Sequence, residues 1–296
     1  MLHPDALAIA ATELKNDPGL SAVFGSYDDQ PGHGSFLSQY RNLFHHWVHQ
    51  TGNEEASTFW TGCGAIRRDV FIEMGGFSPA YGGPSIEDIE LGTRLHRSGY
   101  RIRLLKTMLG THMKNWTFWN LIRTDIFHRG VPWMGLLLRE RRAPNDLNLG
   151  LGSRVATLLA GLLGLSWLVL PLMGHAAGLL PAAAFLLAAT ICIWISNPAN
   201  KDDSRNWIAV LLVISAPLTA YSFAPDPWAV IPMALILSLV CTHLAFFRYL
   251  MQKRSSTFAI AVIPMLVLFF LGCVVAALVG LIKHHLGAQP HPANTT

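Results

Sequence analysis

Three acidic residues lie close together in the stretch from Pro84 to Tyr100, at Glu87, Asp88 and Glu90. A carboxylate held beside a substrate can take a proton from a hydroxyl group, so an adjacent pair of acids is a candidate for general-base chemistry. The same residues also suit the first turn of a helix, where free backbone N–H groups and the helix dipole stabilise negative charge. The acids alone therefore leave both interpretations open.

The helix that would position these acids is marked at both ends. Ser85 is a candidate N-cap, Asp88 completes a pattern similar to a capping box, and Gly99 is the expected stop. Leu91 and Leu95 recur at helical spacing, so their face is expected to pack on a core. The sequence thus predicts a helix whose first turn presents the acids.

A second segment with a recognisable pattern, Trp60–Phe77, precedes this helix. It combines a strand of small residues, a basic pair, a short helix and a Gly-Gly stop. Together the two segments resemble the acceptor half of a membrane-bound family 2 glycosyltransferase of the GT-A fold, in which a Gly-Gly-Phe turn is followed by a Glu-Asp pair that opens a helix. The resemblance covers about residues 1–145.

The resemblance implies transfer of a sugar from a nucleotide-sugar donor, with inversion at the anomeric carbon. Asp88 matches the Asp that serves as catalytic base in the family, and Glu87 would orient Asp88 or bind an acceptor hydroxyl. The small residues Gly62, Cys63 and Gly64 would let the acceptor pass close to the backbone.

Five further residues are weaker candidates for the site. Arg67 and Arg68 would steer the acidic donor, although arginines at the start of a helix are equally well explained as solvated surface. His112 follows a strand and matches the histidine that in many GT-A enzymes completes the metal or diphosphate site; the implied cofactor is Mg²⁺ or Mn²⁺. Arg129 and Trp133 occupy the place of the Q-x-x-R-W element of membrane synthases such as cellulose synthase, which helps hold donor and acceptor. Here the Gln is absent and a proline precedes Trp133, and membrane anchoring would also account for both residues.

The strand candidates are too few for a whole nucleotide-binding α/β fold. They lie at residues 20–26, 59–66 and 101–105, after a helix predicted from Pro4 to Lys15. A crevice at the carboxyl ends of parallel strands needs more strands than these. His3–Leu7 resembles the segment that directly follows the Asp-x-Asp metal motif of the family, so we expect the donor-binding half and that motif to be missing from this chain.

Two other polar groups are predicted to be structural. Asp28 and Asp29 are followed by Pro-Gly, which favours a turn over a replacement for the missing metal motif. His45 and His49 are spaced i, i+4 in a helix expected over Phe36–Gln50 and could clamp a metal. No H-E-x-x-H glutamate accompanies them, so a partly buried amphipathic helix is the favoured interpretation.

The composition divides the chain into two parts. Of its 296 residues 51% are hydrophobic and only 14% are charged, which is too apolar for an ordinary soluble protein. After Asp146 the only acidic residues are Asp202, Asp203 and Asp226. We therefore predict an α/β region, the C-terminal part of a GT-A nucleotide-diphospho-sugar transferase fold, followed by an all-α transmembrane bundle. The expected domains are a partial GT-A domain over residues 1–113, amphipathic interfacial helices over 114–150, a transmembrane domain over 151–285 and a disordered tail over 286–296.

About five membrane-spanning helices are predicted from uncharged runs. Two fit before Lys201, and three more correspond to Trp207–Pro225, Pro227–Phe247 and Ser255–Ile282. Trp207–Pro225 contains prolines and could instead be kinked or re-entrant. Basic residues occur in alternate linkers, so the positive-inside rule predicts a multi-pass inner-membrane protein with its catalytic part in the cytosol.

The implied partners are a nucleotide-sugar donor, a lipid or saccharide acceptor, and the lipid bilayer. Nucleic acid is not expected, because no basic run is interleaved with stacking aromatics. Two alternatives remain open. A polyprenyl-phosphate glycosyltransferase would have little need of a base. A non-catalytic scaffold or transport protein would keep a degenerate cytosolic cap, but the predicted spans contain only His175 and His243 as ionisable residues that could serve transport.

Overall fold

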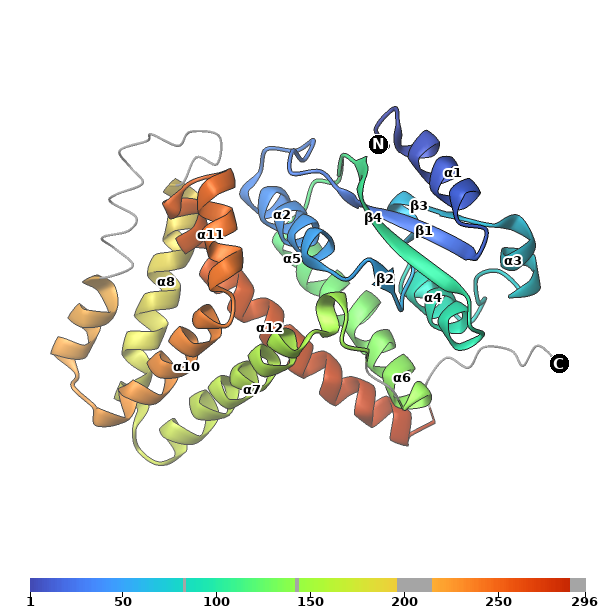
Figure 1. Ribbon diagram of the computed structural model, residues 1–296. Coiled ribbons are helices and arrows are strands. Elements are labelled where there is room, and N and C mark those ends of the chain that lie inside the picture. Colours follow the sequence, from blue (N-terminus) through green and yellow to red (C-terminus); the bar gives the residue numbers. More distant parts are fainter. Residues whose placement is uncertain (82–83, 142–143, 196–214, 288–296) are drawn as a thin grey trace. The chain divides into compact units, whose positions relative to one another are not determined.

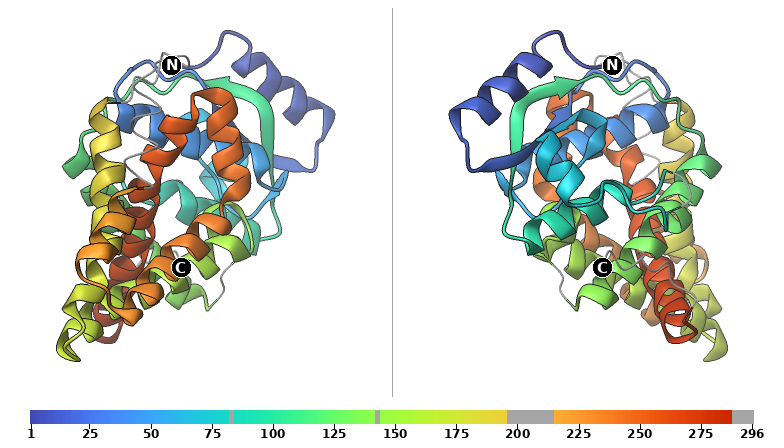
Figure 2. Two further views of the ribbon diagram at one scale, coloured as in Figure 1. Left: turned by 90° about the vertical axis from the view of Figure 1, so that its left-hand side faces the viewer. Right: turned by 90° about the vertical axis from the view of Figure 1, so that its right-hand side faces the viewer.

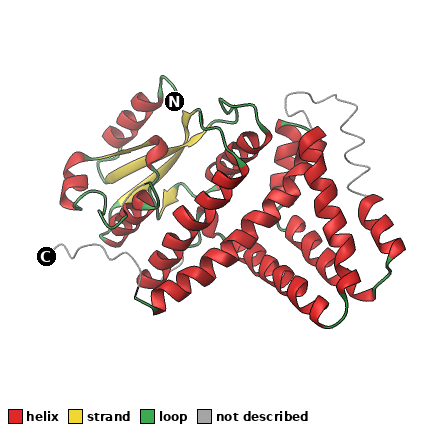
Figure 3. Cartoon of the chain, turned by 180° about the vertical axis from the view of Figure 1, so that it is seen from behind, coloured by secondary structure: helices red, strands yellow, loops and turns green. Residues whose placement is uncertain are grey.

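The computed structural model describes residues 1–81, 84–141, 144–195 and 215–287. The contacts divide the chain into two compact units. The first consists of Met1–His33, Leu37–Gly150 and Ala276–Thr296, and the second of Gly34–Phe36 and Leu151–Val275. Strands occur only in the first unit among the described residues, and the second is helical (Figure 3).

The first unit is built on a four-stranded mixed sheet. Its strand order is β2 (Glu55–Ala56), β4 (Arg101–Gly110), β1 (Leu20–Tyr27) and β3 (Gly64–Ile66). The two central strands, β1 and β4, are parallel, and each edge strand runs antiparallel to its neighbour. The carboxyl ends of β1 and β4 therefore lie at the same end of the sheet, and ligands bind at the carboxyl ends of the strands in open α/β sheets.

The strand predictions differ from the structure in length. The strand expected over residues 59–66 is shortened to β3, because Thr61–Cys63 forms a 3₁₀ turn, η1. The strand expected over 101–105 continues to Gly110, since its second half pairs with the end of β1. The two-residue strand β2 is too short to give a sequence pattern.

Helices cover both faces of the sheet (Figures 1 and 2). Helix α1 (Ala6–Asn16) packs on one face and α4 (Glu87–Arg97) on the other. Leu91 and Leu95 of α4 are fully buried, as the helical spacing predicts, and burial of each such side chain stabilises the fold by roughly 2 kcal/mol. The core on the α1 face contains Ala6, Ala10, Leu20, Val23, Cys63 and Met108. The core on the α4 face contains Phe24, Phe59, Leu91, Leu95 and Leu104.

The beginning of α4 corrects one detail of the sequence analysis. The N-cap residue is Ile86, with no side-chain cap, so the predicted cap by Ser85 is wrong. The hydroxyl of Ser85 instead donates a hydrogen bond to the carbonyl of His128. The predicted stop is confirmed: α4 ends at Arg97, and Gly99 adopts φ +83°, which glycine accommodates without steric cost.

Gly92 lets α4 approach the chain very closely. A Cβ atom at Gly92 would lie 2.1 Å from the backbone nitrogen of Phe59. No side chain fits in that space, so the helix packs directly on the segment that leads into η1. This contact sets the distance between the first turn of α4 and η1.

Two more helices of the first unit flank the sheet. Helix α2 (Phe36–Thr51) bonds to the end of β1 through the imidazole Nδ1 of His49, which lies 2.9 Å from the carbonyl oxygen of Gly25. The short helix α3 (Arg68–Glu73) ends at the Gly-Gly turn, as the sequence predicts.

The segment predicted to form interfacial helices is helical. It contains α5 (Phe118–Arg123), a π-helical turn η2 (Thr124–Gly130), α6 (Val131–Glu140) and a 3₁₀ turn η3 (Leu147–Leu149). Trp119 is 76% exposed. π-Helical turns are rare and occur frequently at functional sites.

The second unit begins with α7 (Leu151–Leu172). It continues with a turn η4 (Ala176–Leu179), α8 (Leu180–Ile195), a helical stretch at 215–223 and a turn η5 (Pro227–Ala229). Helices α10 (Val230–Cys241), α11 (Leu244–Lys253) and α12 (Ser256–His285) follow. The last residues of α12, from Ala276, are grouped with the first unit.

Among the described residues, two helices are long and apolar enough to cross a membrane, α7 and α12. A third span is possible if α10, with the turn before it, and α11 act as one, bent by 66° at their junction. Ala176–Leu187 is apolar but shorter. Of the other predicted features, Lys201, part of Trp207–Pro225 and most of the predicted tail lie outside the described residues. The number of spans and their orientation stay predictions.

Candidate functional site

Asp88 lies in the first turn of α4 and faces η1. Its Oδ2 atom accepts two hydrogen bonds from Thr61, one from the backbone N–H and one from the hydroxyl, each 3.1 Å long. Its Oδ1 atom accepts the N–H of Ile89 at 2.8 Å. All three donors are neutral groups, so they orient the carboxylate without cancelling its charge.

The surroundings of Asp88 make it a stronger base than an ordinary aspartate. Burial raises the pKa of its carboxyl, because the charged form loses hydration, and the neighbouring charge of Glu87 raises it further. The hydrogen bonds from Thr61 and Ile89 act in the opposite direction. The net direction is upward, as general-base catalysis near neutral pH requires.

The two neighbouring acids have structural contacts. Glu87 accepts the backbone N–H of Ser85 at 2.6 Å and so fixes the segment that leads into α4. Glu90 is only 1% exposed and forms two hydrogen bonds with Arg94, at 2.8 and 2.9 Å. Arg94 also donates to carbonyls of the turn after α3. Of the three acids, Asp88 is the one that bonds to η1.

Helix α6 lies beside α4 and runs in the same direction. Near the beginning of α4, Ser85 donates to the backbone carbonyl that precedes Arg129, and at its end Arg97 forms an ion pair of 2.8 Å with Glu140. This register places Arg129 level with the first turn of α4, and the charge of Asp88 raises the pKa of Arg129. The structure therefore brings together two predicted site residues, Asp88 and Arg129.

Arg129 belongs to a group of three cations. Arg41 of α2 forms an ion pair of 2.7 Å with Asp125. The Lys114 ammonium lies 3.7 Å from the centre of the Trp116 ring, and the Arg41 guanidinium lies 5.9 Å from the same ring. Burial lowers the pKa of Arg129, and the charge of Arg41 lowers it further. Like charges that repel one another inside the protein favour binding of an anion.

His112 follows β4 and lies in the same positive surroundings. Burial, together with the charges of Arg41, Lys114 and Arg129, lowers its pKa to about 4, so the imidazole is neutral at neutral pH. Its ring centre lies 4.3 Å from that of Tyr27. The buried Nδ1 atom of His112 has no hydrogen-bond partner in the part of the chain that the structure describes.

The divalent cation that the resemblance implies finds few ligands here. Across the described ranges, no three His, Cys, Asp or Glu side chains lie close enough together to hold a metal ion. His112 stands among cations, which repel a metal ion. Mg²⁺ and Mn²⁺ prefer several oxygen ligands. The described residues therefore do not fit the cation, and a need for Mg²⁺ or Mn²⁺ stays a prediction.

The small residues of η1 are explained by packing. A Cβ atom at Gly62 would lie 2.2 Å from the indole ring of Trp60, and one at Gly64 would lie 2.5 Å from the Trp60 carbonyl oxygen. Cys63 is 1% exposed and its side chain belongs to the core on the α1 face. The structure does not bring the Cys63 side chain to the site, because the residue alternates inward where its two neighbours are exposed.

The basic pair lies away from Asp88. Arg67 donates to the carbonyls of Leu20, Leu14 and Asp17, at 2.7, 2.5 and 3.4 Å. It therefore ties the end of α1 to the beginning of β1. Arg68 is exposed at the start of α3. These contacts favour the structural interpretation of Arg67 over a role in steering the donor.

The polar groups predicted to be structural have structural contacts. Asp28 is 8% exposed and accepts hydrogen bonds from the hydroxyl of Thr111 at 2.6 Å and the backbone N–H of Gln30 at 2.9 Å. The imidazole rings of His45 and His49 lie 4.3 Å apart. Burial lowers the pKa of His49 to about 4.

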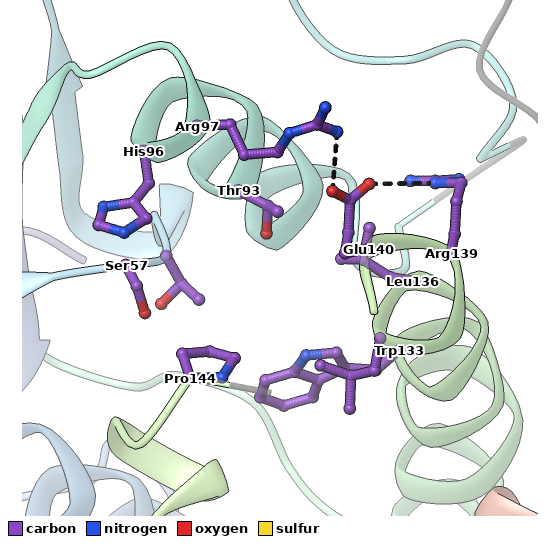
Figure 4. A pocket seen from close by; sticks show the side chains of 11 residues that line it. Ser57, Thr93, His96, Arg97, Trp133, Leu136, Arg139, Glu140 and Pro144 are labelled. Carbon is purple, nitrogen blue, oxygen red and sulfur yellow. Dashed lines mark hydrogen bonds and ion pairs between the residues drawn. The ribbon is translucent and has the colours of Figure 1, made fainter. Parts of the chain in front are cut away.

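Trp133 lies on α6 and lines a cavity of about 320 Å³ between α4 and α6 (Figure 4). The cavity faces the later turns of α4, through Thr93, His96 and Arg97. Figure 4 shows Glu140 between two arginines on the same side of the cavity, and Ser57 and Thr93 line the wall opposite Trp133. Trp133 therefore belongs to a hollow that lies further along α4 than Asp88.

Sequence reasoning missed several residues that shape the site. Thr61 holds Asp88, and the pair of Arg41 and Asp125 stands beside Arg129. These residues come from segments far apart in the chain, so no local pattern connects them. A weak indication existed in the four-residue spacing of Asp125 and Arg129, which fits one face of a helix.

Residues 42–115 match the family described as the N-terminal domain of galactosyltransferase. The matched region begins in α2, includes η1, Asp88 and all of α4, and ends after His112. It spans less than half of the chain, and Arg129 and Trp133 lie outside it. No curated protein matches the chain. The chain thus contains a glycosyltransferase-like segment that includes the candidate base.

Proposed function

We propose that this protein is a glycosyltransferase in which Asp88 removes the proton from an acceptor hydroxyl group. The observation that carries the proposal is that the Asp88 carboxylate is buried and oriented as a base would be. It lies within the segment that matches a galactosyltransferase domain, it is oriented by three neutral hydrogen bonds, and burial raises its pKa.

The reaction proceeds by direct displacement. Asp88 accepts the hydroxyl proton as the acceptor oxygen forms a bond to the anomeric carbon of the donor sugar. The bond between that carbon and the donor phosphate oxygen breaks, and the nucleoside diphosphate leaves with the electron pair. Attack from the face opposite the leaving group inverts the configuration. General-base assistance of this kind contributes about 10²- to 10⁴-fold to the rate.

The positive group beside Asp88 suits the leaving diphosphate. Arg129 and Lys114 lie with Arg41 in surroundings where burial and mutual repulsion lower the pKa of both Arg129 and Lys114. A diphosphate would relieve this repulsion and stabilise the charge that develops as the donor bond breaks. The match to a galactosyltransferase domain makes a nucleotide-activated galactose the first donor to test.

Membrane association agrees with an acceptor that is bound to lipid or lies close to the bilayer. Helices α7 and α12 are long and apolar enough to span. In this proposal the protein is a multi-pass protein of the inner membrane with its site in the cytosol, where nucleotide sugars are the donors.

Replacing Asp88 by Asn tests the proposal. The variant keeps the size of the side chain but cannot take a proton, so transfer of labelled galactose in membranes that contain the protein is expected to fall about 10²- to 10⁴-fold. Because the folded state raises the pKa of Asp88, its ionised form costs stability at neutral pH, and D88N is expected to keep or slightly raise the melting temperature.

Asp69→Asn is the matched control, since Asp69 is an exposed acid in the first turn of α3. It should leave transfer unchanged. Unaltered turnover by D88N would disprove the role of the base.

A phosphate acceptor is the second candidate, and the three cations favour it. A polyprenyl phosphate is already ionised and needs no base, so its glycosylation should tolerate D88N. Transfer to a phosphate acceptor that survives D88N but fails in Arg129→Gln would select this alternative.

A further inference from the structure

The cavity beside Trp133 that Figure 4 draws adjoins a second hollow. The second hollow, of about 400 Å³, shares Ser57, His96 and Pro144 with the first and continues past the end of α4 to Tyr100 and Asp146. The two hollows adjoin along these three residues, and we call them together the α4 groove. All of its residues belong to the first unit.

The α4 groove has the chemistry of a carbohydrate site. Trp133 and Pro144 give it apolar ring surfaces, on which the C–H face of a sugar can pack. Hydroxyl and imidazole groups stand opposite, on Ser57, Thr93 and His96 (Figure 4). A mainly apolar pocket with a few convergent polar groups is the usual form of a small-molecule site.

One polar atom of the groove lacks a partner. The Ser57 hydroxyl oxygen is buried and has no hydrogen bond in the described part of the chain, although the Ser57 backbone N–H reaches Asp146 at 3.4 Å. A buried hydroxyl without a partner costs stability, commonly about 1–3 kcal/mol. A ligand hydroxyl bound at Ser57 would remove this cost.

The arginines of the groove, Arg97, Arg101 and Arg139, are matched in number by the carboxylates of Glu55, Glu140 and Asp146, and this balance of formal charge favours a neutral ligand. Arg97 contacts Glu140 at 2.8 Å, and Glu140 also lies 3.4 Å from Arg139. At the other end, Arg101 pairs with Glu55 at 3.0 Å. The groove thus differs from the surroundings of Asp88, where cations repel one another.

The position of the groove along α4 bears on the length of the ligand. Thr93 and Arg97 follow Asp88 by five and nine residues, which is about 7 to 14 Å along the helix axis. A sugar bound against Thr93 and Arg97 is therefore not the sugar whose hydroxyl group reaches Asp88.

We propose that the α4 groove binds the non-reacting part of a neutral oligosaccharide acceptor of two or more sugars. This inference rests on the proposed function and narrows its acceptor from a lipid or saccharide to a saccharide chain. Trp133 and Ser57 act as binding residues for the distal sugars, and Asp88 acts at the terminal one.

Binding of the full-length protein in detergent to an array of immobilised glycans of one to four sugars tests the inference. The wild-type protein is expected to bind one class of glycans with two or more sugars and not the corresponding monosaccharides. Trp133→Ala is expected to weaken this binding at least about tenfold, because it removes the packing surface, and Ser57→Ala about three- to tenfold.

Two variants control for folding and for general loss of aromatic surface. Trp133→Phe keeps a ring and should restore most of the binding. Trp119→Ala removes an exposed tryptophan of α5 and should leave the binding unchanged. Binding of no glycan, equal binding of the monosaccharide, or binding by W133A at the wild-type level would overturn the inference.

Asp88→Asn separates this inference from the proposed function. If D88N and the wild type bind glycans equally while W133A does not, the groove is supported whether or not transfer is detected. If D88N abolishes transfer and W133A leaves both glycan binding and the KM for the acceptor unchanged, the base is supported and the groove is not.

Discussion

The first unit contains two clusters of charged side chains that differ in how well their charges are paired. At one edge of the sheet, Arg101 and Arg103 meet three carboxylates, Glu13, Asp17 and Glu55, at 2.5 to 3.4 Å. We call this group the sheet-edge cluster. Each cation there has at least two acidic partners, and the groups are partly exposed. Such a cluster satisfies its own charges and has little use for a ligand.

The second cluster lies near the first turn of α4. Arg41, Lys114 and Arg129 stand with the two carboxylates of Asp88 and Asp125, so positive charge is in excess. Burial lowers the pKa of Arg129 and Lys114, and it raises that of Asp88. Unlike the sheet-edge cluster, this group destabilises the fold when its members are ionised, because burial and repulsion between like charges oppose their charged forms. Perturbed groups of this kind gather at functional sites.

The largest difference between the clusters is expected for Arg129→Gln. If Arg129 stabilises the leaving diphosphate, loss of its charge-assisted hydrogen bonds should reduce transfer about 10- to 100-fold. The melting temperature should hold or rise, because Arg129 is repelled by Arg41. Membrane transfer assays and thermal unfolding in detergent measure the two effects, and a large fall in melting temperature would instead mark Arg129 as structural.

A smaller change is expected when Thr61 becomes Val. The hydroxyl of Thr61 lowers the pKa of Asp88, so its removal lets that pKa rise further. In the proposed mechanism transfer requires the ionised carboxylate, and the acidic limb of the pH profile of kcat/KM should therefore move to higher pH. Rates on the plateau should change less than about threefold, since the backbone N–H of Thr61 still donates.

Thr51→Val is the control for this change, because the Thr51 hydroxyl donates to the carbonyl of Trp47 within its own exposed helix turn. Its pH profile should match that of the wild type. A shift of the acidic limb to lower pH in T61V would contradict the assignment of that limb to Asp88.

The smallest effect is expected for Arg103→Gln in the sheet-edge cluster. Ion pairs at the protein surface that water still reaches contribute little, so the free energy of unfolding should fall by about 1 kcal/mol or less, and transfer should not change. The hydrogen bond from Arg101 holds the pKa of Glu55 below its usual value. The contribution of the cluster is therefore present above the ordinary carboxyl pKa and is lost as the pH falls through the lowered one.

High salt should weaken the effect of R103Q further, because exposed charges are screened. Unfolding curves at low and high ionic strength make this comparison. If R103Q loses transfer while its melting temperature is unchanged, the sheet-edge cluster takes part in the reaction, and the contrast between the two clusters is wrong.

Local patterns in the sequence were enough to predict most of the helices and a glycosyltransferase-like segment. The apolar spacing of Leu91 and Leu95, the acids at the start of α4 and Gly99 at its end depend on contacts within a few residues. The apolar run that becomes α12 is equally local. Patterns of this range can be read along the chain, because helix geometry fixes which residues share a face.

Which of these residues lie at the candidate site, and which have structural contacts instead, depends on the tertiary structure. Asp88 differs from Glu90 because Thr61, 27 residues away, bonds to the former, while the latter is neutralised by Arg94 in its own helix. Arg67 turned out to hold backbone carbonyls, and Arg129 came to lie beside Asp88. Burial and partners set the charge state of a side chain, and both depend on chain segments that only the fold brings together.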